Sequence, residues 1–231
     1  MRHLFLLPVL TLVLQAGESL PERLQTVQRI SADAIRQLQA ELALAEGPAE
    51  AKAYHEAHLA YHLAARRQAK EPKADLALLE RAIQILEPRK DAESRALLGA
   101  CLGVKIGFSP MSGMTLAPKA SALFEAALQQ SPGNPRVLML QGVHVLNTPA
   151  FFGGGAKVAL PILEAAVKAG EGEKAPADAW APGWGKAETL VWLAQAQRGV
   201  GQEPAATASL QKALVLDPTY GHALSLLKTG K

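Results

Sequence analysis

A recurring pattern of small and large apolar residues most restricts the fold of this 231-residue chain. An alanine, or a substitute for it, is followed four positions later by a large apolar residue, then by a second alanine and by a proline or glycine. The four copies are Asp75, Leu79, Ala82 and Pro88; Ala120, Phe124, Ala127 and Pro132; Ala159, Leu163, Ala166 and Gly170; and Ala206, Leu210, Ala213 and Pro218. Small residues at helical spacing allow two helices to approach closely, and the large residue fills the remaining space. The pattern therefore predicts repeated pairs of antiparallel helices.

The rest of the sequence is also typical of helices. Hydrophobic residues make up 49% of the chain and aromatic residues only 5%, and alanine and leucine, both strong helix formers, dominate the apolar content. No stretch has the alternation of a half-buried strand, so we expect an all-α protein. Capping residues, prolines and glycines predict helices over residues 19–46, 49–70, 74–86, 91–106, 118–131, 135–147, 156–169, 185–199, 204–216 and 220–228.

The repeated pattern resembles that of the tetratricopeptide repeat (TPR) family, whose unit of about 34 residues is a helix–turn–helix. The resemblance extends from about Ala49 to Pro218. It implies an α-solenoid of about four antiparallel helix pairs, with capping helices at both ends. The copies are spaced more widely than in the family, and the additional residues fall in 107–117, 148–155 and 170–184. These segments are rich in glycine or proline, so we expect loops that decorate a functional surface.

The first residues have the pattern of an export signal. A short basic start precedes an apolar run from Leu4 to Leu14, and the small residues Ala16 and Gly17 follow. This is the order of regions in a secretory signal peptide, and the run is shorter than the roughly 20 residues that span a bilayer. We expect residues 1–17 to be a cleaved signal peptide and residues 18–231 to form one helical domain. The mature protein would be periplasmic or secreted, without stable insertion into a membrane.

Three histidines lie on one face of the helix predicted over 49–70. His55, His58 and His62 are three and four residues apart, so their imidazoles can face one point. Imidazoles bind zinc, copper or nickel, but the spacing does not match the zincin pattern, so packing or a place in a ligand groove is favoured and we predict no metal. The resemblance implies that the first helix of each pair lines the concave face. We therefore expect a partner to contact Tyr54, His55, His58, Tyr61 and His62.

Two of the predicted loops carry phenylalanines. Residues 107–114 include Phe108, and residues 148–155 include Phe151 and Phe152 before three glycines. Methionine and phenylalanine adapt to varied partners, so we expect these three phenylalanines to contribute to binding, with packing on their own repeats as the alternative. The glycine-rich segment follows no predicted strand and lacks the serine or threonine of a phosphate-binding loop, so we expect no nucleotide there.

Several classes of function are disfavoured by the sequence. The net charge of +3 is small and the basic residues are scattered, which is unlike a nucleic-acid-binding protein. The single cysteine, Cys101, excludes an internal disulfide and a cysteine-rich zinc site, and its apolar neighbours are unlike those of an activated thiol. The sequence has neither a serine nucleophile elbow nor a convincing pair of catalytic carboxylates. We expect no cofactor and no enzymatic activity.

The interpretation that best accounts for these features is a non-enzymatic periplasmic TPR-type scaffold or adaptor that binds a protein or peptide. An alternative is an accessory solute-binding subunit of a periplasmic substrate importer, in which residues 108–114 and 151–155 would converge on a cavity. Family members with that role are typically lipoproteins, and the lack of a cysteine near the signal weighs against it. A metalloenzyme based on the three histidines is a third hypothesis.

Overall fold

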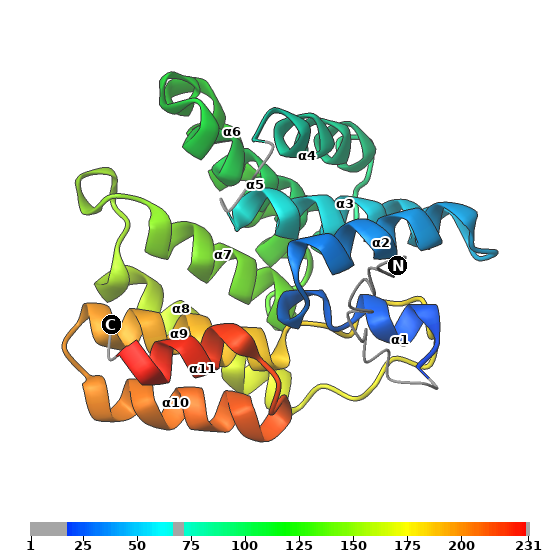
Figure 1. Cartoon of the computed structure of the whole chain (residues 1–231). Coiled ribbons are helices and arrows are strands. Elements are labelled where there is room, and N and C mark those ends of the chain that lie inside the picture. The colour runs from blue at the N-terminus through cyan, green and yellow to red at the C-terminus, as the bar shows by residue number, and fades with distance from the viewer. Residues whose placement is uncertain (1–17, 67–71, 230–231) are drawn as a thin grey trace, which may run out of the picture.

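The computed structural model describes residues 18–66 and 72–229, and within these ranges it consists of helices and loops without any strand (Figure 1). Three 3-10 turns, η1 to η3, lie at Val27–Arg29, Pro110–Ser112 and Ala150–Phe152. The α-helices are α1 (Leu20–Leu24), α2 (Ala32–Leu44), α3 (Ala49–Ala65), α4 (Pro72–Leu86), α5 (Ala92–Phe108), α6 (Gly113–Gln130), α7 (Pro135–Asn147), α8 (Ala156–Glu171), α9 (Lys186–Gly199), α10 (Glu203–Leu216) and α11 (Gly221–Thr229). The predicted all-α class is confirmed.

Consecutive helices pack as antiparallel pairs, α3 with α4, α5 with α6, α7 with α8 and α9 with α10. Each pair also contacts the next one, so the pairs form a stack in the order of the sequence. At the N-terminal end α2 packs on α3, and at the C-terminal end α11 packs on α10. The four predicted pairs and the additional helices at both ends are therefore present.

The repeated residues form the contacts between paired helices, as predicted. Each of the four copies has three residues before its final proline or glycine. All twelve of these side chains are buried, with exposed fractions of 0–2%. In the first copy Asp75 replaces alanine, and its carboxylate accepts a hydrogen bond of 2.9 Å from Nη2 of Arg36 on α2. This pairing provides the buried charge with the partner that it requires.

Gly142 lies where α7 packs closely against α8. A Cβ atom at this position would lie 2.7 Å from Cδ2 of Leu163, which is fully buried on α8. We expect Gly142→Val to lower the free energy of unfolding by about 1–3 kcal/mol, because the packed leucine must move. Chemical denaturation measures the change, and Gly133→Ala is the control because a Cβ there meets nothing within 4 Å. Equal stability of the two variants would contradict this account of the pairing.

Two helix predictions were wrong. The single helix expected over 19–46 is divided into α1, η1 and α2, because Ser31 begins a new helix by accepting a hydrogen bond from the backbone N–H of Ala34. The loop expected over 107–117 is largely helical, and α6 begins at Gly113 with Pro118 inside it. Proline is tolerated there because few backbone hydrogen bonds precede it in the helix.

The segment of residues 172–185 between α8 and α9, here called the long loop, extends back to the N-terminal part of the chain (Figure 1). The side chain of Gln25 donates to the carbonyl of Ala181 at 3.2 Å and accepts from the backbone N–H of Gly183 at 2.8 Å. A Cβ at Gly47 would lie 2.5 Å from the ring of Trp180, so glycine is required for this contact. The insertion therefore joins the N-terminal part of the chain to the connection between the third and fourth helix pairs instead of projecting from the stack.

The predicted signal peptide, residues 1–17, lies outside the described residues. Among the helices that the structure describes, none is both long and apolar enough to cross a membrane.

Candidate functional site

The five α3 residues predicted to contact a partner lie inside the protein. Their exposed fractions are at most 5%, and His55 and His58 are fully buried. His55 and His58 contact the long loop and His62 lies beside Glu188 of α9, so these side chains form no surface. We call His55, His58 and His62 the histidine cluster. Contact of these five residues with a partner stays a prediction. In the structure they pack inside the protein.

The long loop contributes two tryptophans to the histidine cluster. The ring of His58 stacks on Trp184, with ring centroids 4.1 Å apart and an angle of 24° between the planes. Nε2 of His55 donates a hydrogen bond to the carbonyl of Trp180 at 2.9 Å. Nε2 of His58 and Nε2 of His62 are 3.0 Å apart, a distance at which one imidazole donates and the other accepts. The cluster therefore holds the long loop against α3.

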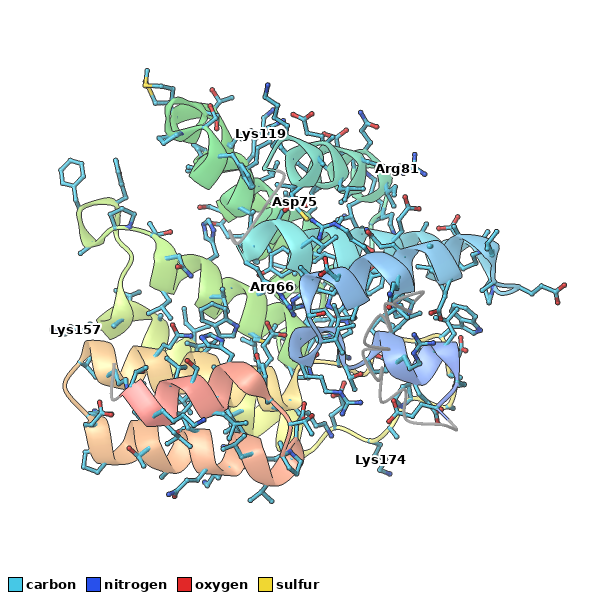
Figure 2. All side chains as sticks on the ribbon, viewed as in Figure 1. Arg66, Asp75, Arg81, Lys119, Lys157 and Lys174 are labelled. Carbon is cyan, nitrogen blue, oxygen red and sulfur yellow. The ribbon has the colours of Figure 1, made fainter. Side chains whose placement is uncertain are left out.

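Helix α9 supplies a buried carboxyl group beside the cluster. Oε2 of Glu188 lies 3.8 Å from Nε2 of His62, and Oε1 accepts a hydrogen bond from the indole N–H of Trp192. At the C-terminal end of α3, the Arg66 guanidinium donates to the carbonyls of Val27 and Gln28 at 2.9 and 3.1 Å. Figure 2 shows Arg66 in the interior, whereas Lys119, Lys157 and Lys174 lie apart at the periphery.

Burial determines the charge state of these groups. It lowers the pKa of His62 to about 3 and, with the two neighbouring imidazoles, lowers that of His58 well below its usual range. Burial also raises the pKa of Glu188 to about 7, against the opposing effects of Trp192 and Arg66. At neutral pH His62 is therefore uncharged, and its contact with Glu188 is not an ion pair.

The chemistry available at the cluster is limited. Burial raises the pKa of Cys101, which keeps this thiol protonated and unreactive. Within residues 18–66 and 72–229, no group of three or more histidine, cysteine, aspartate or glutamate residues is arranged to hold a metal ion. The residues described thus form a packed polar core, and they supply no exposed acid–base or nucleophilic group.

The predicted loop residues fall into two groups. Phe151 and Phe152 project from η3 with exposed fractions of 88% and 73%, and their rings contact each other. Phe108 at the end of α5 is half-buried against the main core. Beyond it, Met111 in η2 and Met114 at the start of α6 are 83% and 85% exposed. The two loops therefore present large apolar side chains to solvent, although Phe108 itself contributes mainly to packing.

Two open pockets lie elsewhere in the part of the chain that the structure describes. One, of about 550 Å³, is bounded by α8, α9 and α10, with Leu190 and Leu193 among its walls. The other, of about 440 Å³, lies between the first turns of α5 and α7, α3 and the long loop, and includes Tyr54 and Trp180. Residues 108–114 and 151–155 line neither pocket, so the convergence expected for a solute-binding role is absent from both.

Sequence reasoning missed the buried ionic residues. Glu93 on α5 accepts from Nε of Arg136 at 2.8 Å, and Arg136 in turn pairs with Glu173 at 2.6 Å. Glu188 beside the cluster was missed as well. These residues come from different helices and from the long loop, and single charged residues on a helix carry no signal of such partners.

Comparison with known proteins supports the fold alone. No protein-family model and no curated protein matches the chain. Among solved structures it is similar to the HusA haemophore from Porphyromonas gingivalis, with a TM-score of 0.58 and 24% sequence identity. The matched region covers 78% of this chain and 91% of the haemophore chain. The resemblance to the TPR family stays a prediction.

Proposed function

We propose that this chain is a non-enzymatic, exported binding protein that holds a partner protein through its two apolar loops. The observation that carries the proposal is the exposure of Met111, Met114, Phe151 and Phe152, each more than 70% accessible. Large apolar side chains in this position cost solvation free energy unless a partner covers them, and contiguous exposed apolar groups commonly mark interaction sites. Both loops lie along the same side of the molecule, at the left in Figure 1.

Further features agree with a scaffold or adaptor function. Stacked helix pairs offer extended surfaces, and a predicted signal peptide at residues 1–17 would take the protein to the periplasm or outside the cell. The histidine cluster is buried, and its groups provide no activated nucleophile or acid–base pair that a substrate could reach. We propose accordingly that binding, not catalysis, is the activity of the chain.

We expect the double variant Phe151→Ser/Phe152→Ser to lose at least about tenfold in partner capture, because each phenylalanine contributes about 1.5–3 kcal/mol on burial. The measurement is a quantitative pull-down from periplasmic or culture extract with the immobilised protein. The matched control is Val215→Ser/Leu216→Ser, which removes two exposed apolar side chains from α10. Equal recovery of the enriched proteins by both double variants would contradict the proposal.

A second candidate function is binding of haem, which is favoured by the similarity to a haemophore. The exposed sulfurs of Met111 and Met114 are chemically able to ligate haem iron, and phenylalanines can pack on a porphyrin face. Absorbance titration with haemin distinguishes the two candidates. A saturable shift of the main absorption band that disappears in Met111→Ala/Met114→Ala would favour haem, and an unshifted band would favour a partner protein.

A further inference from the structure

The long loop is held to the rest of the protein by few contacts. Residues 174–179 are exposed, and residues 180–185 form its packed part. This packed part contains no helix, so its backbone lacks the repeated hydrogen bonds of the helix pairs around it. Segments with few contacts open locally at a lower cost than regular elements do. The long loop is therefore more able to move away from α3 than the helix pairs are to separate.

The contacts of this packed part with α3 are made by histidines. Trp184 stacks on the ring of His58 with centroids 4.1 Å apart, and the carbonyl of Trp180 accepts a hydrogen bond from His55. Both of these histidines are fully buried. Nε2 of His58 is 3.0 Å from Nε2 of His62, and a hydrogen bond there needs one of the two nitrogens to be without a proton. Uptake of a proton by each imidazole is therefore incompatible with this arrangement.

The carboxyl group beside the histidine cluster becomes neutral in acid. Oε2 of Glu188 on α9 lies 3.8 Å from Nε2 of His62, and burial raises the pKa of this carboxyl group to about 7. Below pH 7 it is increasingly protonated and no longer offers a full negative charge to an imidazolium. The Arg66 guanidinium adds to the effect of burial in lowering the pKa of His62. The other titratable groups nearby stay neutral because burial raises their pKa values, and they are Tyr54, Tyr61, Cys101 and Tyr220.

The surroundings of His58 also oppose a positive charge. Arg136 on α7 acts with burial and the two neighbouring imidazoles to lower the pKa of His58. The carboxylates of Glu93 and Glu173 pair with Arg136, at 2.8 and 2.6 Å, and not with an imidazole. Cation–π attraction to Trp184 favours a protonated His58 by about 30-fold at most, which is less than the cost of burying an unpaired charge. A protonated His58 therefore needs contact with water.

We propose that the long loop is a pH-sensitive strap on α3. When His55 and His58 take up protons, residues 180–184 detach from α3 while the helix pairs stay folded. Release opens an aromatic surface, formed by Tyr54 on α3 and by the ring of Trp184, that is closed at neutral pH. The strap is separate from the two apolar loops, so it does not depend on the partner proposed for them.

Two probes in the unmodified chain separate release of the loop from unfolding. The backbone N–H of Gly183 donates to Oε1 of Gln25 at 2.8 Å. Its hydrogen exchange, measured by NMR and divided by the intrinsic rate at each pH, gives the opening constant of the loop. Cys101 is fully buried on α5 and is the single cysteine of the chain, so its reaction with a dipyridyl disulfide reports opening of the helix pairs.

Between pH 6.5 and 5.0 we expect the opening constant of the loop to rise by about tenfold to a hundredfold per pH unit. Each histidine that regains its ordinary pKa of 6.5 on release contributes about tenfold. At each pH the constant from Gly183 should exceed that from Cys101 by at least about tenfold. Equal constants at the two sites would overturn the proposal, because the loop would then open only with the whole fold. An opening constant of the loop that does not rise between these pH values would overturn it as well.

The variant His58→Phe tests the proton acceptor, because phenylalanine can stack on Trp184 and takes up no proton. The rise in the opening constant of the loop should be about tenfold smaller per pH unit in this variant. His144→Phe on α7 is the matched control, since the ring of His144 contacts Phe124, and it should keep the full rise. An undiminished rise in His58→Phe would contradict the proposal. The comparison of Gly183 with Cys101 decides it independently of whether this variant folds.

Discussion

Replacing Trp184 with alanine is expected to lower the free energy of unfolding by about 3–5 kcal/mol. The side chain is 2% exposed and stacks on His58, so its removal leaves a large cavity between α3 and the long loop. The change should be measured by urea denaturation at pH 7.5, followed by circular dichroism.

The control for this variant is Trp184→Phe, which keeps an aromatic ring against His58 and should lose less stability. A loss of under about 1 kcal/mol in Trp184→Ala would mean that the long loop contributes little to the folded state. Such a result would be inconsistent with the packing described for the histidine cluster.

Acidification is expected to destabilise the protein steeply below pH 6.5. The ordinary pKa of histidine is 6.5, whereas burial lowers that of His62 to about 3 and that of His58 in the same direction. Above pH 6.5 both imidazoles are neutral in the folded and unfolded states. As the pH falls from 6.5 towards the folded pKa, the unfolded chain takes up protons that the folded chain does not. Each histidine then costs about 1.4 kcal/mol per pH unit.

Glu188 has the opposite dependence on pH. Its folded pKa of about 7 exceeds the ordinary value of 4.5, so its contribution to stability is complete below pH 4.5 and is lost as the pH rises towards 7. Burial also lowers the pKa of His55, His144 and His222. Several histidines therefore act against one carboxyl group, so between pH 4.5 and 6.5 the net effect of acid is destabilising.

The variant His58→Phe tests this dependence, because phenylalanine can still stack on Trp184 and does not titrate. The free energy of unfolding should be measured by urea denaturation at several pH values from 4.5 to 7.5. We expect its slope against pH to fall by about 1.4 kcal/mol per pH unit in the variant. His222→Gln should keep more of the slope, because burial lowers the pKa of His222 less than that of His58. An unchanged slope in His58→Phe would show that folding does not lower the pKa of His58.

The helix pairs were predictable because their contacts are local in the sequence. Ala206, Leu210 and Ala213 lie on one helix face, and a proline follows, so composition and spacing suffice to place them in a helix pair. Gly142 illustrates the same rule from the partner helix. The pattern alone predicted which side chains are buried between paired helices.

The surroundings of the histidine cluster were not predictable in this way. His55, His58 and His62 share one helix face, but the residues that cover them, Trp184 and Glu188, are more than a hundred positions away. The long loop was expected to decorate a surface because it is rich in glycine and proline. Local composition predicts that a segment is a loop, but it does not predict where that loop packs.

The contacts between Gln25 and the long loop also affect how the chain can unfold. In an open stack of repeats each pair contacts only its neighbours, so the ends can separate one repeat at a time. Here Gln25 bonds Ala181 and Gly183, and Arg29 lies 3.9 Å from Asp217 at the end of α10. Opening either end breaks contacts of the other, which makes the stack one cooperative unit.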